Sequence, residues 1–377
     1  MDNARAEVVL VGGGLQSGLL ALALLEAGRV PVLIEAEPRL GRGHTWSFHA
    51  ADVPPGAWSW LEPLVAYRWP AHQVRFPSFQ RRETRPYCTI TADHFDRVVR
   101  ARVERAGGQV RTGTRAIRVS ATEVELLAGP TLRAEIVIDA RGAGPSDHPA
   151  AYQKFLGLEL ELEEDAPYSE PILIDATVEQ LDGFRFVYVL PFSPRHLLIE
   201  DTYYSDTPDL DPSVARRRVL EYARDLRIAR VVREERGVLP LPFVVPSDPE
   251  TGPLNAGWRG GWFHPTTGYS LPVAVRLAAA VAGGSDLRAL RAHVRAQQAF
   301  CVRLNRMLFG WTPPERRRDV LEHFYRLPID TIERFYSMEL NWLDFVRIFA
   351  RRPPPGLAVS RVLRSTPFSR PIQWRTP

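Results

Sequence analysis

The chain has 377 residues, of which 45% are hydrophobic and 24% are charged, and its formal net charge is +4. This composition is typical of a globular protein, and it excludes a wholly disordered chain and a protein with many membrane-spanning helices. Two cysteines exclude a disulfide scaffold and a cysteine-rich metal site, and the mild positive charge predicts no nucleic-acid partner. The length allows two or three domains of about 100–200 residues each.

The N-terminal segment predicts the start of a parallel β-sheet. Residues 7–11 are a short apolar run, as in a strand that is buried on both faces. Three glycines at 12–14 form a tight turn, residues 15–27 have the pattern of a helix, and residues 30–34 predict a second strand. This succession is a βαβ unit.

The uncharged run 8–25 has some features of a leader or a membrane span. We expect neither, because no basic region precedes it, its length is at the lower limit for a span, and the glycines interrupt it. We therefore expect a chain without a leader, located in the cytoplasm. The small number of cysteines fits this location.

The middle of the chain predicts a change from parallel to antiparallel structure. Trp and Pro are frequent in residues 44–85, where we expect irregular structure. An amphipathic helix over 92–106 and alternating strands over 109–138 follow. From about residue 151 to 250 the pattern is antiparallel, with a hairpin over 184–204.

The C-terminal part predicts helices. A glycine-rich loop over 258–269 precedes a helix over 271–282. Residues 286–350 have the pattern of several further helices.

The glycines at the first strand–helix turn are spaced for binding a dinucleotide. In the pattern Gly12-x-Gly14-x-x-Ser17, Gly12 makes the turn and Gly14 lets the backbone approach a pyrophosphate. A small residue at Ser17 or Gly18 lets helix and strand pack closely, and the N-terminus of the helix offers free N–H groups to phosphate oxygens. Glu35, at the end of the second strand, is placed to accept a hydrogen bond from a ribose hydroxyl. The residues predicted to bind the nucleotide are Gly12, Gly13, Gly14, Leu15 and Glu35. A glycine-rich turn of an ordinary α/β protein is the alternative.

Two later features favour FAD over NAD as the dinucleotide. The apolar strand 136–138 runs into Asp-Ala-Arg-Gly at 139–142, and the loop 258–269 leads into a helix. In large flavoproteins such a loop-to-helix unit returns to the nucleotide domain, where the positive end of its helix stabilises negative charge on a reduced flavin. A plain capped helix is the alternative for this loop.

These elements predict an α/β fold with a Rossmann-like FAD-binding domain, an inserted antiparallel-sheet substrate domain and a C-terminal helical region. We expect a discontinuous FAD-binding domain made of residues 1–50, 86–147 and 256–284. The substrate domain would then comprise residues 51–85 and 148–255, and the helical region residues 285–377.

Several strings of residues match one known family almost from end to end. The most specific are Leu-Leu-Ile-Glu-Asp-Thr at 197–202 and Phe-His-Pro-Thr-Thr-Gly-Tyr-Ser-Leu-Pro at 263–272, and His-Thr-Trp-Ser-Phe at 44–48 also matches. With these strings the chain resembles the bacterial lycopene β-cyclases, which are flavoproteins related to aromatic hydroxylases and geranylgeranyl reductases. The late loop lacks the Gly-Asp pair that is usual in flavin hydroxylases, which argues against hydroxylation.

The resemblance implies an isomerase that converts lycopene through γ-carotene to β-carotene. A proton is added near one end of the polyene, the resulting carbocation closes a ring, and a proton is lost without net transfer of electrons. The resemblance also implies reduced FAD as the active cofactor and NAD(P)H as the reductant. A reduced flavin and aromatic faces stabilise a cation best in a cavity from which water is excluded.

The reaction requires an acid, and two carboxyl groups are adjacent on the returning strand of the predicted hairpin. Neighbours on a strand point to opposite faces, so only one of Glu200 and Asp201 should face the cavity. A carboxyl group in an apolar pocket has a raised pKa and holds a proton at neutral pH. The family motif places the catalytic acid at Glu200, with Asp201 as the second choice. From the residues alone, a solvated acidic pair is the alternative, and reduced flavin is an alternative proton source.

The late loop supplies further candidates. The residues expected to contact the cofactor there are His264, Pro265, Thr267, Gly268 and Tyr269. For His264, a structural role with hydrogen bonds is an equal alternative. Trp46 and Tyr188 are candidates for lining a polyene tunnel, although core packing is the more common role of an aromatic residue. The histidines at 44, 49 and 264 lack the spacing and the carboxylates of a metal site, so we expect no metal.

The substrate that the resemblance implies dissolves in lipid, so we expect peripheral contact with a membrane surface. Beyond Asp344 the chain has no acidic residue, but it carries Arg347, Arg351, Arg352, Arg361, Arg364, Arg370 and Arg375. This tail and the late helices are candidates for docking on anionic lipid. A solvated basic tail is the alternative, and the sequence does not determine the oligomeric state.

Two other classes of function remain open. A flavin-dependent monooxygenase or a geranylgeranyl-reductase-like oxidoreductase would consume NAD(P)H in proportion to product. A carotenoid-binding flavoprotein without activity would need no acid, and the match of Glu200 to the family acid argues against it.

Overall fold

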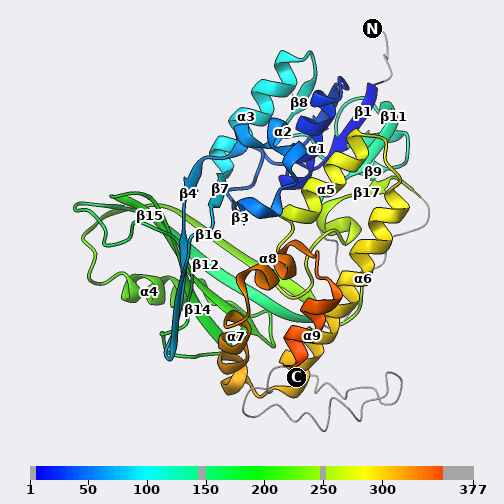
Figure 1. The fold of residues 1–377 in the computed structure, drawn as a ribbon. Coiled ribbons are helices and arrows are strands. Elements are labelled where there is room, and N and C mark those ends of the chain that lie inside the picture. Colours follow the sequence, from blue (N-terminus) through cyan, green and yellow to red (C-terminus); the bar gives the residue numbers. More distant parts are fainter. Residues whose placement is uncertain (1–5, 143–149, 247–251, 351–377) are drawn as a thin grey trace.

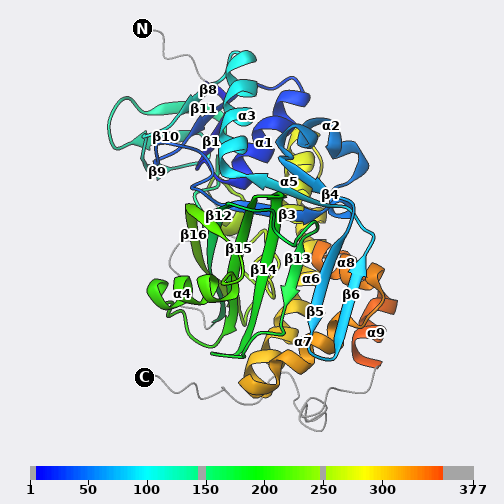
Figure 2. The same ribbon diagram turned by 90° about the vertical axis from the view of Figure 1, so that its left-hand side faces the viewer.

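The computed structural model of the chain describes residues 6–142, 150–246 and 252–350. An α/β unit lies at one end, a large sheet lies at the other, and the C-terminal helices lie beside that sheet (Figures 1 and 2). This arrangement confirms the predicted α/β fold class.

The sheet of the α/β unit forms around the predicted βαβ unit. Its strands are β1 (Ala6–Val11), β2 (Pro31–Ile34), β8 (Gln109–Arg111), β9 (Ala116–Val119), β10 (Glu123–Leu126), β11 (Leu132–Asp139) and β17 (Leu254–Asn255). Their order is β8-β2-β1-β11-β10-β9, with β17 beside β11. Strands β8, β2, β1, β11 and β17 are parallel neighbours, whereas β9, β10 and β11 pair in antiparallel fashion.

The two faces of this sheet are covered differently, which explains the continuous apolar run in β1. Val8 and Leu10 belong to a core shared with α1 (Leu15–Glu26), α3 (Ala92–Arg105) and α5 (Leu271–Ala282). Val9 and Val11 point to the opposite face, where they pack with residues of β10 and β11. Both faces are therefore dry, as expected for a parallel sheet.

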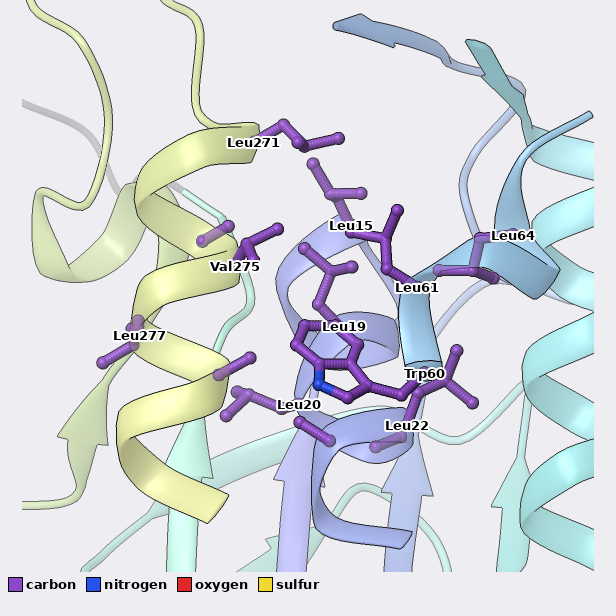
Figure 3. Packing of buried hydrophobic residues seen from close by; sticks show 14 of the residues in the cluster. Leu15, Leu19, Leu20, Leu22, Trp60, Leu61, Leu64, Leu271, Val275 and Leu277 are labelled. Carbon is purple, nitrogen blue, oxygen red and sulfur yellow. The ribbon is translucent and has the colours of Figure 1, made fainter. Parts of the chain in front are cut away.

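Helix α1 lies between α5 and the short helix α2 (Trp58–Leu61), and leucines of α1 fill the space between them (Figure 3). At Gly18 this helix approaches α3 closely, because a Cβ atom there would lie 2.2 Å from Cζ of Phe95. We expected a small residue at Ser17 or Gly18 for packing of helix on strand. At Gly18 the close contact is with another helix, α3.

The large sheet contains the predicted hairpin. Its strands are β5 (His72–Phe76), β6 (Phe79–Glu83), β12 (Ala150–Leu162), β13 (Ile172–Asp175), β14 (Phe184–Ser193), β15 (His196–Ser205) and β16 (Ile228–Pro242). Their order is β16-β12-β15-β14-β13-β5-β6. Helix α4 (Pro212–Tyr222) packs on one face, where Ala215 and Val219 share a core with Leu156 and Val187.

The expectation of irregular structure over 44–85 is wrong. This stretch forms β5 and β6 of the large sheet, and β3 (Thr45–His49) and β4 (Tyr67–Trp69), which flank β7 (Tyr87–Thr91) in a small third sheet. These strands are short, and their partners are distant in sequence, as for β5 and β13. Between β3 and β4, side chains such as Trp60 and Leu64 pack into the core of the α/β unit.

The predicted C-terminal helices are α6 (Leu287–Asn305), α7 (Arg317–Tyr325), α8 (Ile329–Ser337) and α9 (Trp342–Ala350). They lie beside the face of the large sheet that α4 leaves free, and Leu308, Tyr325 and Ile332 pack with Phe76 and Phe186 of that sheet. Within the described residues, none of the helices has the length and apolar composition needed to cross a bilayer.

Candidate active site

A cavity of about 1190 Å³ lies between the α/β unit, the large sheet and the C-terminal helices. One end is formed by the turn between β1 and α1 together with Glu35. The middle is bordered by Tyr188 and Glu200 of the large sheet, and the other end by Ile332 and Ile348 of α8 and α9. The site predicted for a nucleotide and the predicted acid therefore share one cavity.

The turn between β1 and α1 presents bare backbone to this cavity. Gly12 has a φ of +106°, and a Cβ atom there would lie 2.6 Å from the carbonyl oxygen of Ala140, so this position requires glycine. A Cβ atom at Gly14 would meet nothing within 4 Å, so the space in front of it is open. Among the residues that the structure describes, no side chain caps the N-terminus of α1. An anionic group can therefore approach the N–H groups at the uncapped start of α1.

Glu35 borders the same end of the cavity and is fixed by the backbone. Its Oε2 accepts a hydrogen bond from the N–H of Gly13, and its Oε1 accepts one from the N–H of Glu37 at 2.8 Å. Only 4% of its surface is exposed. The five predicted nucleotide-binding residues, Gly12, Gly13, Gly14, Leu15 and Glu35, all line the cavity. Bare glycine backbone, a helix N-terminus and a fixed carboxylate together fit a dinucleotide.

The late loop contributes three of its five predicted residues to the cavity wall, namely Thr267, Gly268 and Tyr269. His264 and Pro265 are not among the lining residues. His264 is fully buried, its Nδ1 accepts a hydrogen bond from the N–H of Thr266 at 3.1 Å, and its Nε2 lies 3.1 Å from the carbonyl oxygen of Phe335. Burial lowers the pKa of His264 to about 3, so the ring is neutral. The geometry therefore fits the structural alternative for this histidine.

The helix that follows this loop points its N-terminus at the cavity. Ser270 and Leu271, at the start of α5, line the wall, and no side chain caps the helix there. The positive end of the helix therefore faces the same space as the glycine turn.

Glu200 and Asp201 point to opposite faces of the large sheet, as the alternation along a strand predicts. Glu200 lines the cavity, whereas Asp201 lies on the face covered by α4. Asp201 is fully buried, its Oδ1 accepts from Nε of Arg185 at 2.7 Å, and its Oδ2 accepts from the hydroxyl of Tyr203. Asp201 thus belongs to a structural network behind the sheet, and Glu200 is the carboxyl group of this pair that a ligand can reach.

The surroundings of Glu200 favour its protonated form. Burial, reinforced by the negative charge of Glu235, raises the pKa of Glu200 to about 8 from an ordinary value of 4.5. The hydroxyl of Thr202 donates to Oε1 of Glu200 at 2.7 Å, which partly opposes the rise. At neutral pH, Glu200 therefore holds a proton inside the cavity.

Aromatic side chains form part of the cavity wall, and one of them lies beside this carboxyl group. Tyr188 is its direct neighbour on β14, and the hydroxyl oxygens of Tyr188 and Tyr87 are 3.1 Å apart. The other aromatic residues of the wall include Trp46, Tyr204, Tyr269, Tyr325 and Tyr336. Such faces can stabilise a cation by about 2 kcal/mol each when water is excluded. Both aromatic residues proposed from the sequence as tunnel candidates line the cavity.

Some polar residues near the cavity were not predicted. Asp52 accepts a hydrogen bond from the hydroxyl of Tyr269 at 2.6 Å, and burial raises the pKa of Asp52 to about 7. His49 and His72 line the wall, and burial lowers their pKa values to about 3 and about 4. All three lie in the stretch that we expected to be irregular, so its sequence gave no indication that they face the site.

Solved structures with the same fold define the class of protein. The chain is similar to a flavin-dependent brominase, with a TM-score of 0.60 and 15% identity over 89% of this chain and 94% of that one. It is also similar to a geranylgeranyl bacteriochlorophyll reductase-like protein from Thermoplasma acidophilum, with a TM-score of 0.58 and 13% identity over 95% and 99% of the two chains. A probable FAD-dependent monooxygenase from Pseudomonas aeruginosa gives a TM-score of 0.59 and 15% identity over 85% and 100%. The fold is thus that of the FAD-dependent enzymes, with a Rossmann-like domain.

Sequence relatives define the family within this class. The model of the family described as "Lycopene cyclase protein" matches residues 7–362. The lycopene β-cyclase of Pantoea ananas is 40% identical over 96% of this chain and 98% of its own length. That of Paracoccus sp. (strain N81106 / MBIC 01143) is 40% identical over 94% and 96%. The chain belongs to the lycopene cyclase family, which confirms the resemblance noted in its sequence motifs.

Proposed function

We propose that this chain is a lycopene β-cyclase, which converts lycopene through γ-carotene to β-carotene. The observation that carries the proposal is Glu200, a carboxyl group that holds its proton at neutral pH in an aromatic-lined cavity. A hydrocarbon offers no group for hydrogen bonding, so an apolar cavity with one protonated acid suits it. The family membership supports the same substrate.

FAD is the proposed cofactor. Gly12, Gly13, Gly14 and the start of α1 would hold its pyrophosphate, Glu35 would bind a ribose hydroxyl, and Thr267, Gly268 and the N-terminus of α5 would border its ring system. Reduced FAD, when bound, would supply negative charge beside the carbocation. We propose NAD(P)H as the reductant, following the family resemblance alone.

The residues of the cavity would divide the work of cyclisation. Glu200 donates its carboxyl proton to the terminal double bond of the polyene, and the aromatic rings beside it, such as Tyr188, face the cation that forms. The proton that leaves the closed ring returns to the carboxylate of Glu200, so the acid is regenerated and protons and electrons balance over the reaction. The bound polyene and the apolar side chains of the wall would keep water away from the cation.

We also propose a division into domains that follows the packing. Residues 51–69 would join the FAD-binding domain, because Trp60 and Leu64 pack in its core and β4 pairs with β7. Residues 72–83, with 150–242, would form the substrate domain, because β5 and β6 extend the large sheet. The expected segment 51–85 would thus be split between the two domains.

Contact with a membrane is proposed at α9. Its residues Trp342, Leu343 and Val346, here called the α9 patch, are 70%, 42% and 51% exposed. Arg347 lies beside the patch, and Ile348 of the same helix lines the cavity. The apolar patch, a neighbouring positive charge and the nearby cavity suit a bilayer that holds the substrate. Six of the seven tail arginines lie outside the described residues.

Vesicle flotation tests this membrane contact. We expect Trp342→Ser to lower the fraction bound to anionic vesicles about fivefold. Leu127→Ser is the matched control, because Leu127 is 66% exposed and follows β10, at the end of the molecule opposite to α9 (Figure 2). Equal binding of both variants and the wild type would refute the α9 patch as the docking surface.

Expression in cells that accumulate lycopene tests the proposed activity. We expect the red pigment to be replaced by β-carotene with the wild-type chain and to remain with Glu200→Gln. Unchanged pigment with a folded, FAD-loaded wild type would refute the cyclase. A product that carries added oxygen or hydrogen would indicate the oxidoreductase alternative instead.

A further inference from the structure

Three neighbouring strands of the large sheet align two carboxyl groups on either side of a glycine. Gly157 of β12 pairs with Glu200 of β15 on one side and with Glu235 of β16 on the other. Tyr188 of β14 extends the row beyond Glu200. Directly paired residues point to the same face of a sheet, so Glu235 shares the face of Glu200.

The glycine leaves the space between the two carboxyl groups free of a side chain. A Cβ atom at Gly157 would lie 3.4 Å from Cβ of Glu200, 3.3 Å from Cγ of Glu235 and 3.1 Å from Cδ1 of Leu198. Neighbouring strands are about 4.8 Å apart, so the two glutamates start about 10 Å apart and their side chains can extend toward each other. Any other residue at 157 would place its side chain between them.

Glu235 is held by an ion pair and a hydrogen bond. Its Oε2 lies 2.6 Å from Nη1 of Arg233 and accepts a hydrogen bond from the hydroxyl of Thr45 at 3.0 Å. Arg233 also binds Glu159 at 2.8 Å. Only 7% of the surface of Glu235 is exposed. The guanidinium and the hydroxyl therefore fix this carboxyl group in a charge-assisted network.

In the described part of the chain, few other charges face this row. His44 lies near Glu235 and Arg233, and burial lowers its pKa, so it is neutral. Tyr188 is a neutral phenol, because burial raises its pKa far above the ordinary value. Asp201 acts on Glu200 from the other face, where Arg185 compensates its charge. Arg233 opposes the effect of Glu235 in part.

We infer that Glu235 is a positioning residue for the acid: its fixed negative charge, set across the gap at Gly157, keeps the proton on Glu200 between turnovers. The inference rests on the proposed role of Glu200 in cyclisation. A negative charge near a carboxyl group makes loss of its proton more costly, and the partners Arg233 and Thr45 are bound to Glu235 and not to Glu200. Glu235 would thereby add to the effect of burial in keeping Glu200 protonated at neutral pH.

The variant Glu235→Gln tests the inference on the FAD-loaded protein. We expect the alkaline limb of the pH profile of kcat/KM to move down by about one pH unit, which lowers cyclisation at pH 8 about fivefold and at pH 6 hardly at all. Glu235→Asp keeps the charge and should retain most of the wild-type profile. Glu234→Gln is the matched control, because Glu234 is the next residue of β16 and pairs with Arg216 at 2.8 Å on the opposite face.

Infrared titration of Glu200 gives a second readout that needs no lycopene. The carbonyl band of the protonated carboxyl group is assigned by its loss in Glu200→Gln, and its midpoint should fall in Glu235→Gln but not in Glu234→Gln. An unchanged midpoint in a Glu235→Gln protein that retains FAD would overturn the inference. A titration midpoint of Glu200 near the ordinary value of 4.5 in the wild type would also overturn the inference. This measurement does not depend on the folding of any variant. Failure of the wild type to cyclise lycopene would refute the proposed function, whereas this titration would still decide the role of Glu235.

Discussion

The raised pKa of Glu200 has a measurable cost in stability, which the variant Glu200→Gln should remove. The pKa of this group is about 8 in the folded chain, against an ordinary value of 4.5. Between these values the folded state binds more protons than the unfolded state, so stability falls as pH rises. Below pH 4.5 both states hold the proton, and the cost disappears.

The size of the effect follows from the width of this pH interval. Each pH unit above 4.5 costs about 1.4 kcal/mol, so the full cost at pH 7 is about 3 kcal/mol. Solvent at the cavity wall screens part of this cost, and we expect a gain of about 2–3 kcal/mol for Glu200→Gln at pH 7. Glutamine has nearly the same shape and can still accept the hydrogen bond from Thr202. The variant should therefore be more stable and inactive.

Urea unfolding at pH 5 and pH 7 measures this difference. We expect the stability of wild type and variant to differ by less than about 1 kcal/mol at pH 5 and by about 2–3 kcal/mol at pH 7. A variant that is less stable than the wild type at both pH values would refute the reasoning. Such a result would mean that Glu200 is ionised and stabilises the fold. This is what the alternative of a solvated acidic pair predicts.

Three further substitutions separate structural residues from those of the cavity. Asp201→Asn should lower the free energy of unfolding by about 3–5 kcal/mol, because it leaves the buried guanidinium of Arg185 without its charged partner. A loss below about 1 kcal/mol in urea unfolding would contradict the structural network behind the sheet. Gly14→Ala should fold normally, because Gly14 has a φ of −82° and open space beside it. The variant should bind FAD about tenfold more weakly in a fluorescence titration, and an unchanged affinity would argue against a pyrophosphate at this turn. His264→Ala should cost about 2–4 kcal/mol of stability, because it leaves the N–H of Thr266 and the carbonyl of Phe335 unpaired. The folded fraction should bind FAD as the wild type does. A selective loss of FAD affinity would indicate that His264 belongs to the cofactor site.

Local patterns were sufficient for the elements whose partners are close in sequence. The βαβ unit around Gly12 and the hairpin that carries Glu200 both formed where the pattern predicted them. Alternation along the strand also predicted that Glu200 and Asp201 face opposite ways. The family resemblance, and not the alternation, indicated that Glu200 is the residue that faces the cavity. The sequence of a single strand does not indicate which side of its sheet will be covered.

Contacts between distant segments could not be predicted from local patterns. Strand β5 is stabilised by β13, about a hundred residues later, so its own sequence looked irregular. His49 and Asp52 reach the site through the same kind of distant pairing. The alignment of Glu235, Gly157 and Glu200 depends on the register of three paired strands. The local sequence around Glu235 does not indicate that it lies near Glu200.

The stoichiometry of the reaction tests the central claim most directly. Purified protein with reduced FAD and lycopene in vesicles should yield γ-carotene and then β-carotene, each with the mass of lycopene, while any NAD(P)H consumed stays far below the amount of product. Product whose mass differs from that of lycopene, or NAD(P)H consumed mole for mole with it, would contradict a cyclisation started by the proton of Glu200.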